Sequence, residues 1–303
     1  MRAPDVAVVI GNYAGERLLP DCIASLHAQT LRPTQILVVD GASADRSVEV
    51  AHELGARVLQ RENRGLGYLY NEGAREASAE LVLLLNNDVA LDERCLELLA
   101  VALQADDSLF AADPRQLDWE GTRDVKARTT LTRGRLLREY IPSLHLDDRV
   151  PSTEIVPTVS AHGAAMLVRR DLLLELGGFD ESFFLEWEDL DLCWRAWLRG
   201  HGSVYVPSAW LRHRVGAATT AADLTPRLAS SHHNLMRFAL KCLPPRAAAR
   251  VLAGELLRLP AHPRLILPAL VAVLRELPEI LRLRRRIAPS SAHLEWVLAG
   301  MPQ

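Results

Sequence analysis

Over its first hundred residues the chain alternates between short aliphatic runs and segments with apolar residues three and four positions apart. Runs of this length are typical of strands buried on both faces, and the wider spacing is typical of helices. The pattern predicts strands at Val6–Ile10, Gln35–Val39, Arg57–Leu59 and Leu81–Leu85, and helices at Glu16–Gln29, Asp45–Leu54, Leu66–Ser78 and Asp92–Leu103. Strands that alternate with helices in this way predict an α/β fold with a parallel sheet and crossover helices.

The rest of the chain is less regular. Residues 113–157 carry scattered arginines and prolines, which predicts loops with at most an edge strand. Strand and helix patterns return afterwards, with strands at Ala164–Val168 and Ser203–Val206 and a helix at Glu188–Arg199. Asp171 is expected to cap a further short helix that ends at Gly177-Gly178. From Thr225 onward the pattern is helical only, so we expect one α/β domain over residues 1–224 and a helical C-terminal extension over 225–303.

Composition narrows the function classes. The chain has 303 residues, of which 49% are hydrophobic and 24% charged, as in ordered globular proteins. Its formal net charge of −3 argues against a nucleic-acid partner, which usually requires a basic bias. The four cysteines are far apart, which argues against a zinc cage or disulfide framework and favours a reducing, cytoplasmic setting. No apolar run reaches the roughly 18–20 residues that a membrane-spanning helix needs.

Polar residues follow three of the predicted strands, as Gly11-Asn12-Tyr13, Asp40-Gly41 and Asn86-Asn87-Asp88. The carboxyl ends of parallel strands meet at one edge of the sheet, where ligands bind, so we expect these residues to lie together. Each also has a simpler interpretation. Asp40 would shape its own turn, Tyr13 would be a packing residue, and Asp88 would cap the following helix.

Two later clusters also carry candidate chemistry. Acidic residues gather between Asp180 and Asp191 beside large aromatic side chains, an environment that suits sugar recognition or raises the pKa of a carboxyl group. The simpler interpretation is an acidic helix start, with Asp191 and Arg195 as a surface pair. His213 stands between two arginines that are compatible with a diphosphate, although a single histidine after a strand is more often structural.

These pieces, in this order, resemble the family 2 glycosyltransferases. The likeness runs from about Val6 to Gly216 and is closest to bacterial rhamnosyltransferase-like members that build cell-surface polysaccharide. Besides the motifs above, it rests on Asn63-Arg64-Gly65, Asn71-Glu72-Gly73, His162-Gly163-Ala164 and Trp187-Glu188-Asp189. The resemblance implies a GT-A fold, which is a Rossmann-like, mostly parallel sheet flanked by helices.

The resemblance also implies roles. Asp189 is similar to the family's catalytic base, with Glu188 beside it, and Asp88 and His213 would hold Mn²⁺ or Mg²⁺. Tyr13 would stack on the nucleotide base and Asp40 would recognise it. The other residues implied in binding the nucleotide-sugar are Asn12, Arg64, Asn71, Asn86, Asn87, His162 and Gly163. Asn86 departs from the first aspartate of the family's D-x-D motif, and His162 stands where relatives often have threonine or serine.

The expected function is therefore inverting, metal-dependent sugar transfer from a nucleotide-diphosphate donor, with dTDP-rhamnose favoured, to a glycan or lipid-linked acceptor. A sugar-1-phosphate nucleotidyltransferase is one alternative, but it needs an activating lysine in the first half of the sheet, and no lysine precedes Lys126. A non-catalytic scaffold is another, but it would not need both Asp88 and Asp189.

The apolar tail carries two interpretations. It forms a helix packed on the domain or a homodimer face, or it lies on the inner face of the plasma membrane with Arg282 and Arg284–Arg286 at the headgroups.

Overall fold

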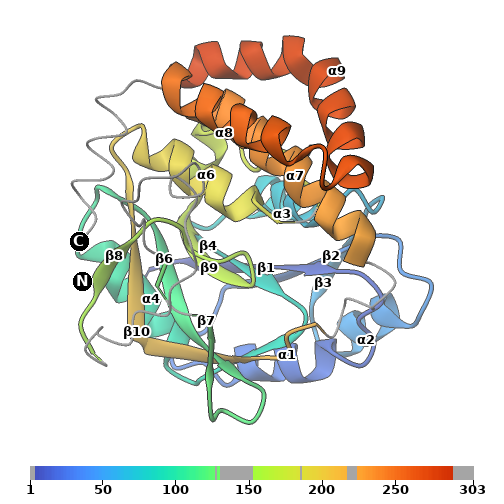
Figure 1. The fold of residues 1–303 in the computed structure, drawn as a ribbon. Helices are drawn as coiled ribbons and strands as arrows, with labels where there is room; N and C mark the ends of the chain where they lie inside the picture. The colour runs from blue at the N-terminus through green and yellow to red at the C-terminus, as the bar shows by residue number, and fades with distance from the viewer. Residues whose placement is uncertain (1–3, 127, 130–152, 185, 217–223, 289–303) are drawn as a thin grey trace.

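The computed structural model describes residues 4–126, 128–129, 153–184, 186–216 and 224–288 (Figure 1). The predicted loop at 130–152 and the end of the C-terminal extension at 289–303 lie outside these residues. One mixed sheet organises the fold, with strands in the order β3-β2-β1-β4-β9-β6-β10-β5 and with β7 and β8 paired to β6 and β10. The strands are β1 (Val6–Asn12), β2 (Gln35–Asp40), β3 (Arg57–Gln60), β4 (Leu81–Asn86), β5 (Val89–Leu91), β6 (Leu109–Asp118), β7 (Asp124–Lys126), β8 (Val156–Thr158), β9 (Ala165–Arg169) and β10 (Gly202–His213).

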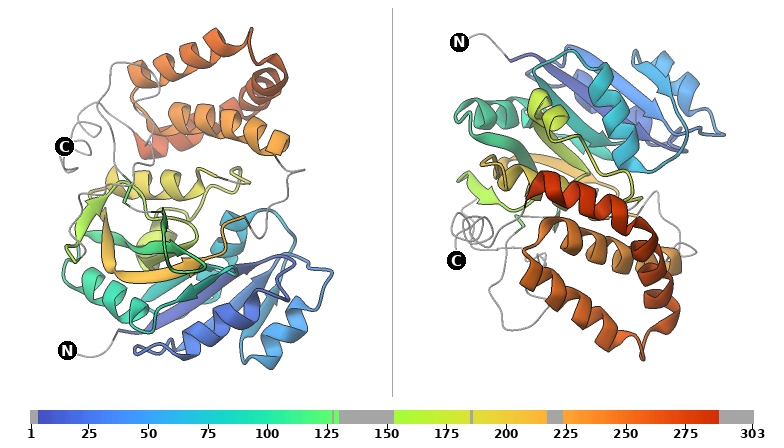
Figure 2. Two further views of the ribbon diagram at one scale, coloured as in Figure 1. Left: turned by 60° about the horizontal axis from the view of Figure 1, so that its bottom comes forward. Right: turned by 90° about the horizontal axis from the view of Figure 1, so that it is seen from above.

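Helices cover both faces of this sheet (Figures 1 and 2). Helices α1, α2 and α4 pack on one face, and α3, α5 and α6 on the other. Strands β1 and β4 are buried on both faces, which explains their aliphatic runs. The helices are α1 (Leu19–His27), α2 (Ser47–Glu53), α3 (Leu66–Glu76), α4 (Cys95–Gln104), α5 (Arg170–Glu175), α6 (Glu188–Trp197), α7 (Leu224–Cys242), α8 (Pro245–Arg258) and α9 (Pro263–Ile287).

The prediction of loops from residue 113 was wrong at its start. Strand β6 runs to Asp118 in the interior of the sheet, between β9 and β10. Strand β10 also continues far beyond the predicted Val206, through a register shift between Val206 and Trp210. Strand β6 was not predicted because Asp113 and Gln116 interrupt its apolar run. Both are buried and have hydrogen-bond partners on other elements.

The C-terminal helices form a third layer over α6. Trp194 and Trp197 of α6 pack against Phe238 of α7. On the inner face of α9, Val273 and Ile280 pack against Met236 of α7. Figure 1 shows α9 bending around this layer, and two prolines, Pro268 and Pro278, lie inside the helix. The boundary between a 1–224 domain and a separate extension stays a prediction.

Buried charges join α6 to this layer. Asp191 and Arg195 form a 2.9 Å ion pair, which confirms their expected pairing, but both are buried, so the interpretation as a surface pair was wrong. Lys241 of α7 lies 2.7 Å from Asp191 and also pairs with Asp180, to which Arg237 donates two hydrogen bonds of 3.0 Å. Each buried cation therefore has an acidic partner, as burial of charge requires.

Candidate active site

The carboxyl ends of β1, β2 and β4 bring three predicted site residues into direct contact. Asn12 is paired with Asp40 across the sheet, and its Nδ2 donates a 2.8 Å hydrogen bond to Asp40 Oδ1. Asn87 Nδ2 in turn donates to Asn12 Oδ1 over 2.7 Å. The expected gathering of these residues at one sheet edge is confirmed.

Gly15 permits this amide network to form. A Cβ at Gly15 would fall 2.0 Å from Asn12 Oδ1 and 2.4 Å from Asn87 Nδ2. Only a residue without a side chain therefore leaves room for the two amides.

The side chain of Asp40 makes hydrogen bonds within the protein, whereas that of Tyr13 is exposed. Both carboxylate oxygens of Asp40 accept hydrogen bonds from Ser43, so Asp40 does shape its own turn, as the simpler interpretation had it. Tyr13 is 55% exposed, so it is not a packing residue, and its ring is accessible to a ligand. Their roles toward a nucleotide base stay predictions.

Asp88 and His213 meet because β5 pairs with the end of β10, placing His213 opposite Val89. His213 Nε2 lies 3.4 Å from Asp88 Oδ1, and Nδ1 of the same ring donates to Gln116 Oε1 over 3.1 Å. The bond from Nδ1 fixes the orientation of the ring and points Nε2 at the carboxylate of Asp88. Asp88 does not cap α4, which begins at Cys95 after Arg94.

This pair of acceptors suits a divalent cation. Asp88 Oδ1 is buried and accepts no hydrogen bond from any described residue, which is the environment of an oxygen that binds a metal. The described residues contain no group of three or more His, Cys, Asp or Glu side chains able to hold a metal ion. Asp88 and His213 alone would therefore supply a cation with two protein ligands.

Tyr70 of α3 connects this edge to the turn before β9. Its hydroxyl lies 2.9 Å from Asn86 Oδ1 and 2.8 Å from the carbonyl oxygen of Gly163. Burial, together with the carboxylates of Glu188 and Asp88, raises the pKa of Tyr70 well above its usual value. The hydroxyl therefore stays protonated and neutral over the physiological pH range.

Glu188 and Asp189 open α6 beside the same turn. Asp189 Oδ2 accepts a 3.0 Å hydrogen bond from Gly163 N, and Oδ1 accepts one of 2.6 Å from Leu190 N. A Cβ at Gly163 would lie 3.4 Å from Glu188 Oε1, so both acids border this glycine. Glu188 is buried and Asp189 is half-buried, which leaves Asp189 the more accessible of the two.

The turn that leads into α6 has unusual backbone geometry. Glu186 and Trp187 adopt φ values of 64° and 74°, in the left-handed region that non-glycine residues rarely enter. Helix α7 holds this turn in place. Asn234 Nδ2 donates to the Glu186 carbonyl over 2.9 Å, and the Trp187 ring lies 5.6 Å from that of Phe238.

His162 forms a buried pair with Asp113 of β6. The ring nitrogen Nδ1 lies 2.9 Å from Asp113 Oδ2, and the backbone N–H of His162 donates to Oδ1 over 3.1 Å. Burial raises the pKa of Asp113, although His162 opposes this rise. This pair fixes the residue next to Gly163.

Three residues at the site were missed by the sequence analysis, namely Tyr70, Asp113 and Gln116. Tyr70 occupied an ordinary apolar helix position, and the other two lay in a strand that was not predicted. A charged or amide residue inside a hydrophobic run is the only signal that the sequence offered.

Arg64 and Asn71 do not join the central cluster. Arg64 donates to Glu181 over 2.8 Å and stacks on Tyr68. The Asn71 amide accepts from Phe179 N over 2.8 Å and donates to the Phe179 carbonyl over 3.0 Å, so it fastens α3 to the loop after α5. Their predicted contacts with a nucleotide-sugar stay predictions.

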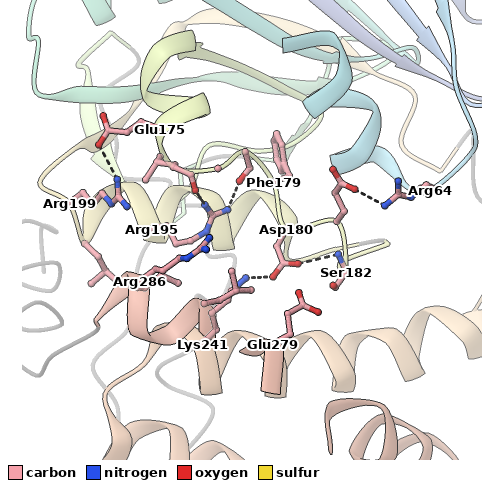
Figure 3. Close-up of a pocket in the computed structure, with 17 residues that line it drawn as sticks. Arg64, Glu175, Phe179, Asp180, Ser182, Arg195, Arg199, Lys241, Glu279 and Arg286 are labelled. Carbon is pink, nitrogen blue, oxygen red and sulfur yellow. Dashed lines mark hydrogen bonds and ion pairs between the residues drawn. The ribbon is translucent and has the colours of Figure 1, made fainter. Parts of the chain in front are cut away.

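A cavity of about 520 Å³ lies at the other end of α6 (Figure 3). Arg64 is the single predicted site residue on its wall, which is formed mainly by α5, the loop after it, α6 and α9. Its charged groups pair with one another, as in Arg199 with Glu175 over 3.0 Å and Lys241 with Asp180. The cavity therefore marks the junction with the C-terminal helices rather than the candidate active site.

Comparison with known protein families decides the identity of this arrangement. The model of glycosyl transferase family 2 matches residues 7–177, more than half of the chain. The chain belongs to glycosyl transferase family 2. The match extends from β1 through β9 and includes Asn12, Asp40, Asn86-Asn87-Asp88 and Gly163.

Curated relatives of this family 2 glycosyltransferase are enzymes of glycan synthesis. N-acetylglucosaminyl-diphospho-decaprenol L-rhamnosyltransferase of Mycobacterium tuberculosis is 28% identical over 255 residues, which cover 76% of this chain and 82% of that protein. Low-salt glycan biosynthesis hexosyltransferase Agl10 of Haloferax volcanii is 27% identical over 200 residues, covering 63% of this chain and 61% of that protein. The chain is thus a glycosyltransferase similar to rhamnosyltransferases, which decides against a nucleotidyltransferase.

Solved structures agree on the GT-A fold. The mannosyltransferase PcManGT of Pyrobaculum calidifontis, in complex with GDP-Man and Mn²⁺, has a TM-score of 0.57 and 18% identity over 99% of this chain and 85% of that one. GalNAc-T7 with UDP, GalNAc and Mn²⁺ has a TM-score of 0.60 and 16% identity, covering 78% of this chain and 48% of that one. The family 2 chain therefore spans about half the length of GalNAc-T7. At these identities the likeness establishes the fold alone.

Proposed function

We propose that this glycosyltransferase moves a deoxyhexose, with inversion, from a nucleoside diphosphate donor to a hydroxyl of a lipid-linked glycan acceptor during synthesis of cell-surface polysaccharide. The observation that carries the proposal is the connected site in which Tyr70 joins the Asn86–Asp88 turn to Gly163, and Gly163 holds Asp189. The proposed donor-binding edge and the proposed base therefore belong to one rigid assembly.

The donor occupies the edge formed by β1, β2 and β4. Tyr13 supplies an exposed ring for the nucleotide base, and Asp40 ends β2 at that edge, opposite Asn12. Asp88 and His213 would hold a divalent cation, with Mn²⁺ or Mg²⁺ as the ion and the donor phosphates as further ligands. When bound, such a cation neutralises the charge that develops on the leaving diphosphate.

Asp189 performs the proton transfer. The acceptor oxygen forms a bond to the anomeric carbon as the bond to the diphosphate oxygen breaks, and the acceptor proton passes to Asp189. The hydrogen bonds from Gly163 N and Leu190 N fix the orientation of this carboxylate and leave its remaining lone pairs for the acceptor hydroxyl. A single displacement inverts the anomeric centre, and Glu188 orients the acceptor beside Asp189.

The donor and acceptor are proposed from the likeness to the mycobacterial enzyme, whose name specifies rhamnosyl transfer to a lipid-diphosphate-linked N-acetylglucosamine. We accordingly propose dTDP-rhamnose as donor, and a site of action at the cytoplasmic face of the plasma membrane. No helix among the described residues is both long and apolar enough to cross a membrane.

The test supplies dTDP-rhamnose, UDP-N-acetylglucosamine or GDP-mannose together with N-acetylglucosaminyl diphosphate on a short alkyl chain, with Mn²⁺, Mg²⁺ or EDTA. We expect transfer from dTDP-rhamnose only, suppression by EDTA, and a product of inverted anomeric configuration by NMR. Preference for another donor, a retained configuration or transfer unaffected by EDTA would each overturn the corresponding part of the proposal. Asp189→Asn is the matched inactive control.

A further inference from the structure

The end of the molecule farthest from the sheet carries an unusual concentration of exposed apolar side chains. Half of the twelve large hydrophobic residues that are exposed in the described chain belong to α8 and α9. Figures 1 and 2 show these two helices, together with α7, beyond α6 and away from the sheet, although the C-terminal half of α9 lies beside α5 and α6 along the cavity. We name as the α8–α9 corner the outward residues on either side of the turn at 259–262: Leu256, Leu257, Arg264, Leu267, Val271, Leu274 and Arg275.

On α9 the exposed apolar residues share one face. Leu267, Val271 and Leu274 follow the spacing i, i+4, i+7 and are 53%, 38% and 65% exposed. The opposite face has Ala269 and Val273 packed against Met236 of α7, and Ile266 on the same side is also buried. The first half of α9 therefore has two apolar faces, and the fold uses only one of them. Leu257, near the C-terminal end of α8 and just before the turn, is 79% exposed.

The charged residues of the α8–α9 corner are arginines, and Glu276, which follows Arg275, pairs with His233 and Arg237 of α7. Between Leu243 and Arg275 the sequence holds five arginines and a single acid, Glu255, in a chain whose overall charge is −3. Glu255 is 1% exposed and is engaged by His232 over 2.6 Å and by Arg258 over 2.9 Å. No carboxylate of this segment therefore faces outward, while Arg246, Arg264 and Arg275 are exposed.

Exposed leucines bordered by arginines match the boundary between acyl chains and headgroups in an anionic bilayer. A second copy of the chain is a poorer match. A two-fold interface places the same patch on both sides, which would bring the arginines of one copy against those of the other. We propose that the α8–α9 corner is the surface by which this protein binds an anionic phospholipid membrane.

This location differs from the one expected from the sequence. Arg284 turns inward and donates to the carbonyl oxygens of Leu240 and Leu243 over 2.6 and 2.7 Å, and Arg286 lines the cavity beside α6. The arginine cluster at the end of α9 therefore serves partly as a helix-to-helix contact, and the membrane surface lies at the other end of the helix.

The proposal rests on the proposed function in one respect: a lipid-linked acceptor would explain why the protein binds a membrane. The test is flotation of the full chain with vesicles of phosphatidylglycerol and phosphatidylcholine, or of phosphatidylcholine alone, at low and high salt. We expect binding to the anionic vesicles, weakened about 25-fold at low salt by Arg264→Gln with Arg275→Gln, at roughly fivefold for each arginine. Leu257→Ser with Leu274→Ser is expected to weaken binding at both salt concentrations by about tenfold or more.

Matched controls change the same residue types elsewhere on the surface. Arg46→Gln with Arg94→Gln removes two exposed arginines near α2 and α4, and Val101→Ser removes an exposed apolar side chain from α4. These controls are expected to bind as the unchanged protein does. Equal weakening by the controls, or no binding to anionic vesicles, would overturn the proposal. A dimer in sedimentation velocity that the two leucine substitutions dissociate would also overturn it, in favour of self-association.

Donor hydrolysis without vesicles, measured on the same preparations, separates this proposal from the proposed function. A variant of the α8–α9 corner that loses vesicle binding but retains hydrolysis tests the membrane proposal alone. Absence of hydrolysis in the unchanged protein would contradict the proposed function and leave the membrane proposal unaffected.

Discussion

The backbone N–H of Gly163 donates a 3.0 Å hydrogen bond to Oδ2 of Asp189. This bond joins the turn before β9 to the first turn of α6, two segments that are neighbours in space only. Because the donor is a main-chain group, the bond depends on the path of the backbone at Gly163. The orientation of Asp189 is thus set by the sheet as well as by its own helix.

Asp189→Asn is expected to lower the rate of sugar transfer by about 10²–10⁴-fold, because an amide cannot accept the proton of the acceptor hydroxyl. Binding of the nucleoside diphosphate, measured by calorimetry, is expected to stay within about twofold. The matched control is Asp171→Asn, which changes an aspartate whose side chain is 97% exposed on α5. Retention of more than half of the activity would exclude Asp189 as the base and direct attention to Glu188.

Asp88→Ala is expected to abolish the enhancement of nucleoside diphosphate binding by Mn²⁺, because Asp88 supplies the unpaired carboxylate oxygen beside His213. The measurement is a titration of the diphosphate with and without Mn²⁺ in both proteins. Asp92→Ala in the neighbouring turn is the control. An identical Mn²⁺ enhancement in Asp88→Ala and the unchanged protein would show that Asp88 binds no metal.

Tyr70→Phe removes the hydroxyl between Asn86 and Gly163 while keeping the buried ring. We expect kcat to fall about tenfold with KM for the donor within about twofold, since the variant loosens the connection between donor edge and base without removing a binding group. The free energy of unfolding should fall by about 1–3 kcal/mol, because the single hydroxyl proton within reach of Asn86 Oδ1 and the buried Gly163 carbonyl is lost.

Tyr68→Phe, on the same helix but with a partly exposed ring, is the control for Tyr70→Phe. A loss of stability in Tyr70→Phe with kcat unchanged would reduce Tyr70 to a purely structural residue.

Asp180 gives the free energy of unfolding a dependence on pH. Burial alone would raise the pKa of this carboxyl group, but Lys241 and Arg237 outweigh burial and hold it well below the ordinary value of 3.8. A group with a lowered folded pKa stabilises fully above its unfolded pKa, and the contribution disappears as pH falls through the folded pKa. Asp180→Asn is therefore expected to cost about 3 kcal/mol at pH 7 and progressively less below pH 4.

Urea unfolding at pH 7, 5 and 3 measures this difference, with Asp171→Asn as the control. A constant difference between Asp180→Asn and the unchanged protein at all three pH values would contradict the lowered pKa.

The parts of the fold that hydrophobic pattern alone specifies were predictable. Strands β1, β2 and β4 are aliphatic because both faces are buried, and the polar residues after them mark the site edge. Strand β6 escaped prediction because Asp113 and Gln116 interrupt its apolar run. Each is accommodated by one distant histidine, and no periodicity reveals such a partner.

The motifs predicted which residues belong to the candidate site, but not how those residues contact one another. Motif order placed Asp88, His213 and Asp189 among the candidates, yet the contacts that connect them depend on tertiary pairing. The three-residue strand β5 brings Asp88 to His213, and Tyr70 reaches Gly163 across the sheet edge. The simpler interpretation placed Asp191 and Arg195 at the surface, because helical spacing shows which residues are neighbours but not what covers them.

The left-handed turn at Glu186 and Trp187 affects which truncations and substitutions this enzyme can tolerate. The two residues immediately before Glu188 hold an unfavourable backbone conformation, and Asn234 and Phe238 of α7 oppose its relaxation. A shortened chain that ended before α7 would retain every strand and every proposed catalytic group and would still lose their alignment. A genetic screen for inactive variants would accordingly recover substitutions at Asn234 alongside those at Asp189, although Asn234 touches no substrate in the proposed reaction.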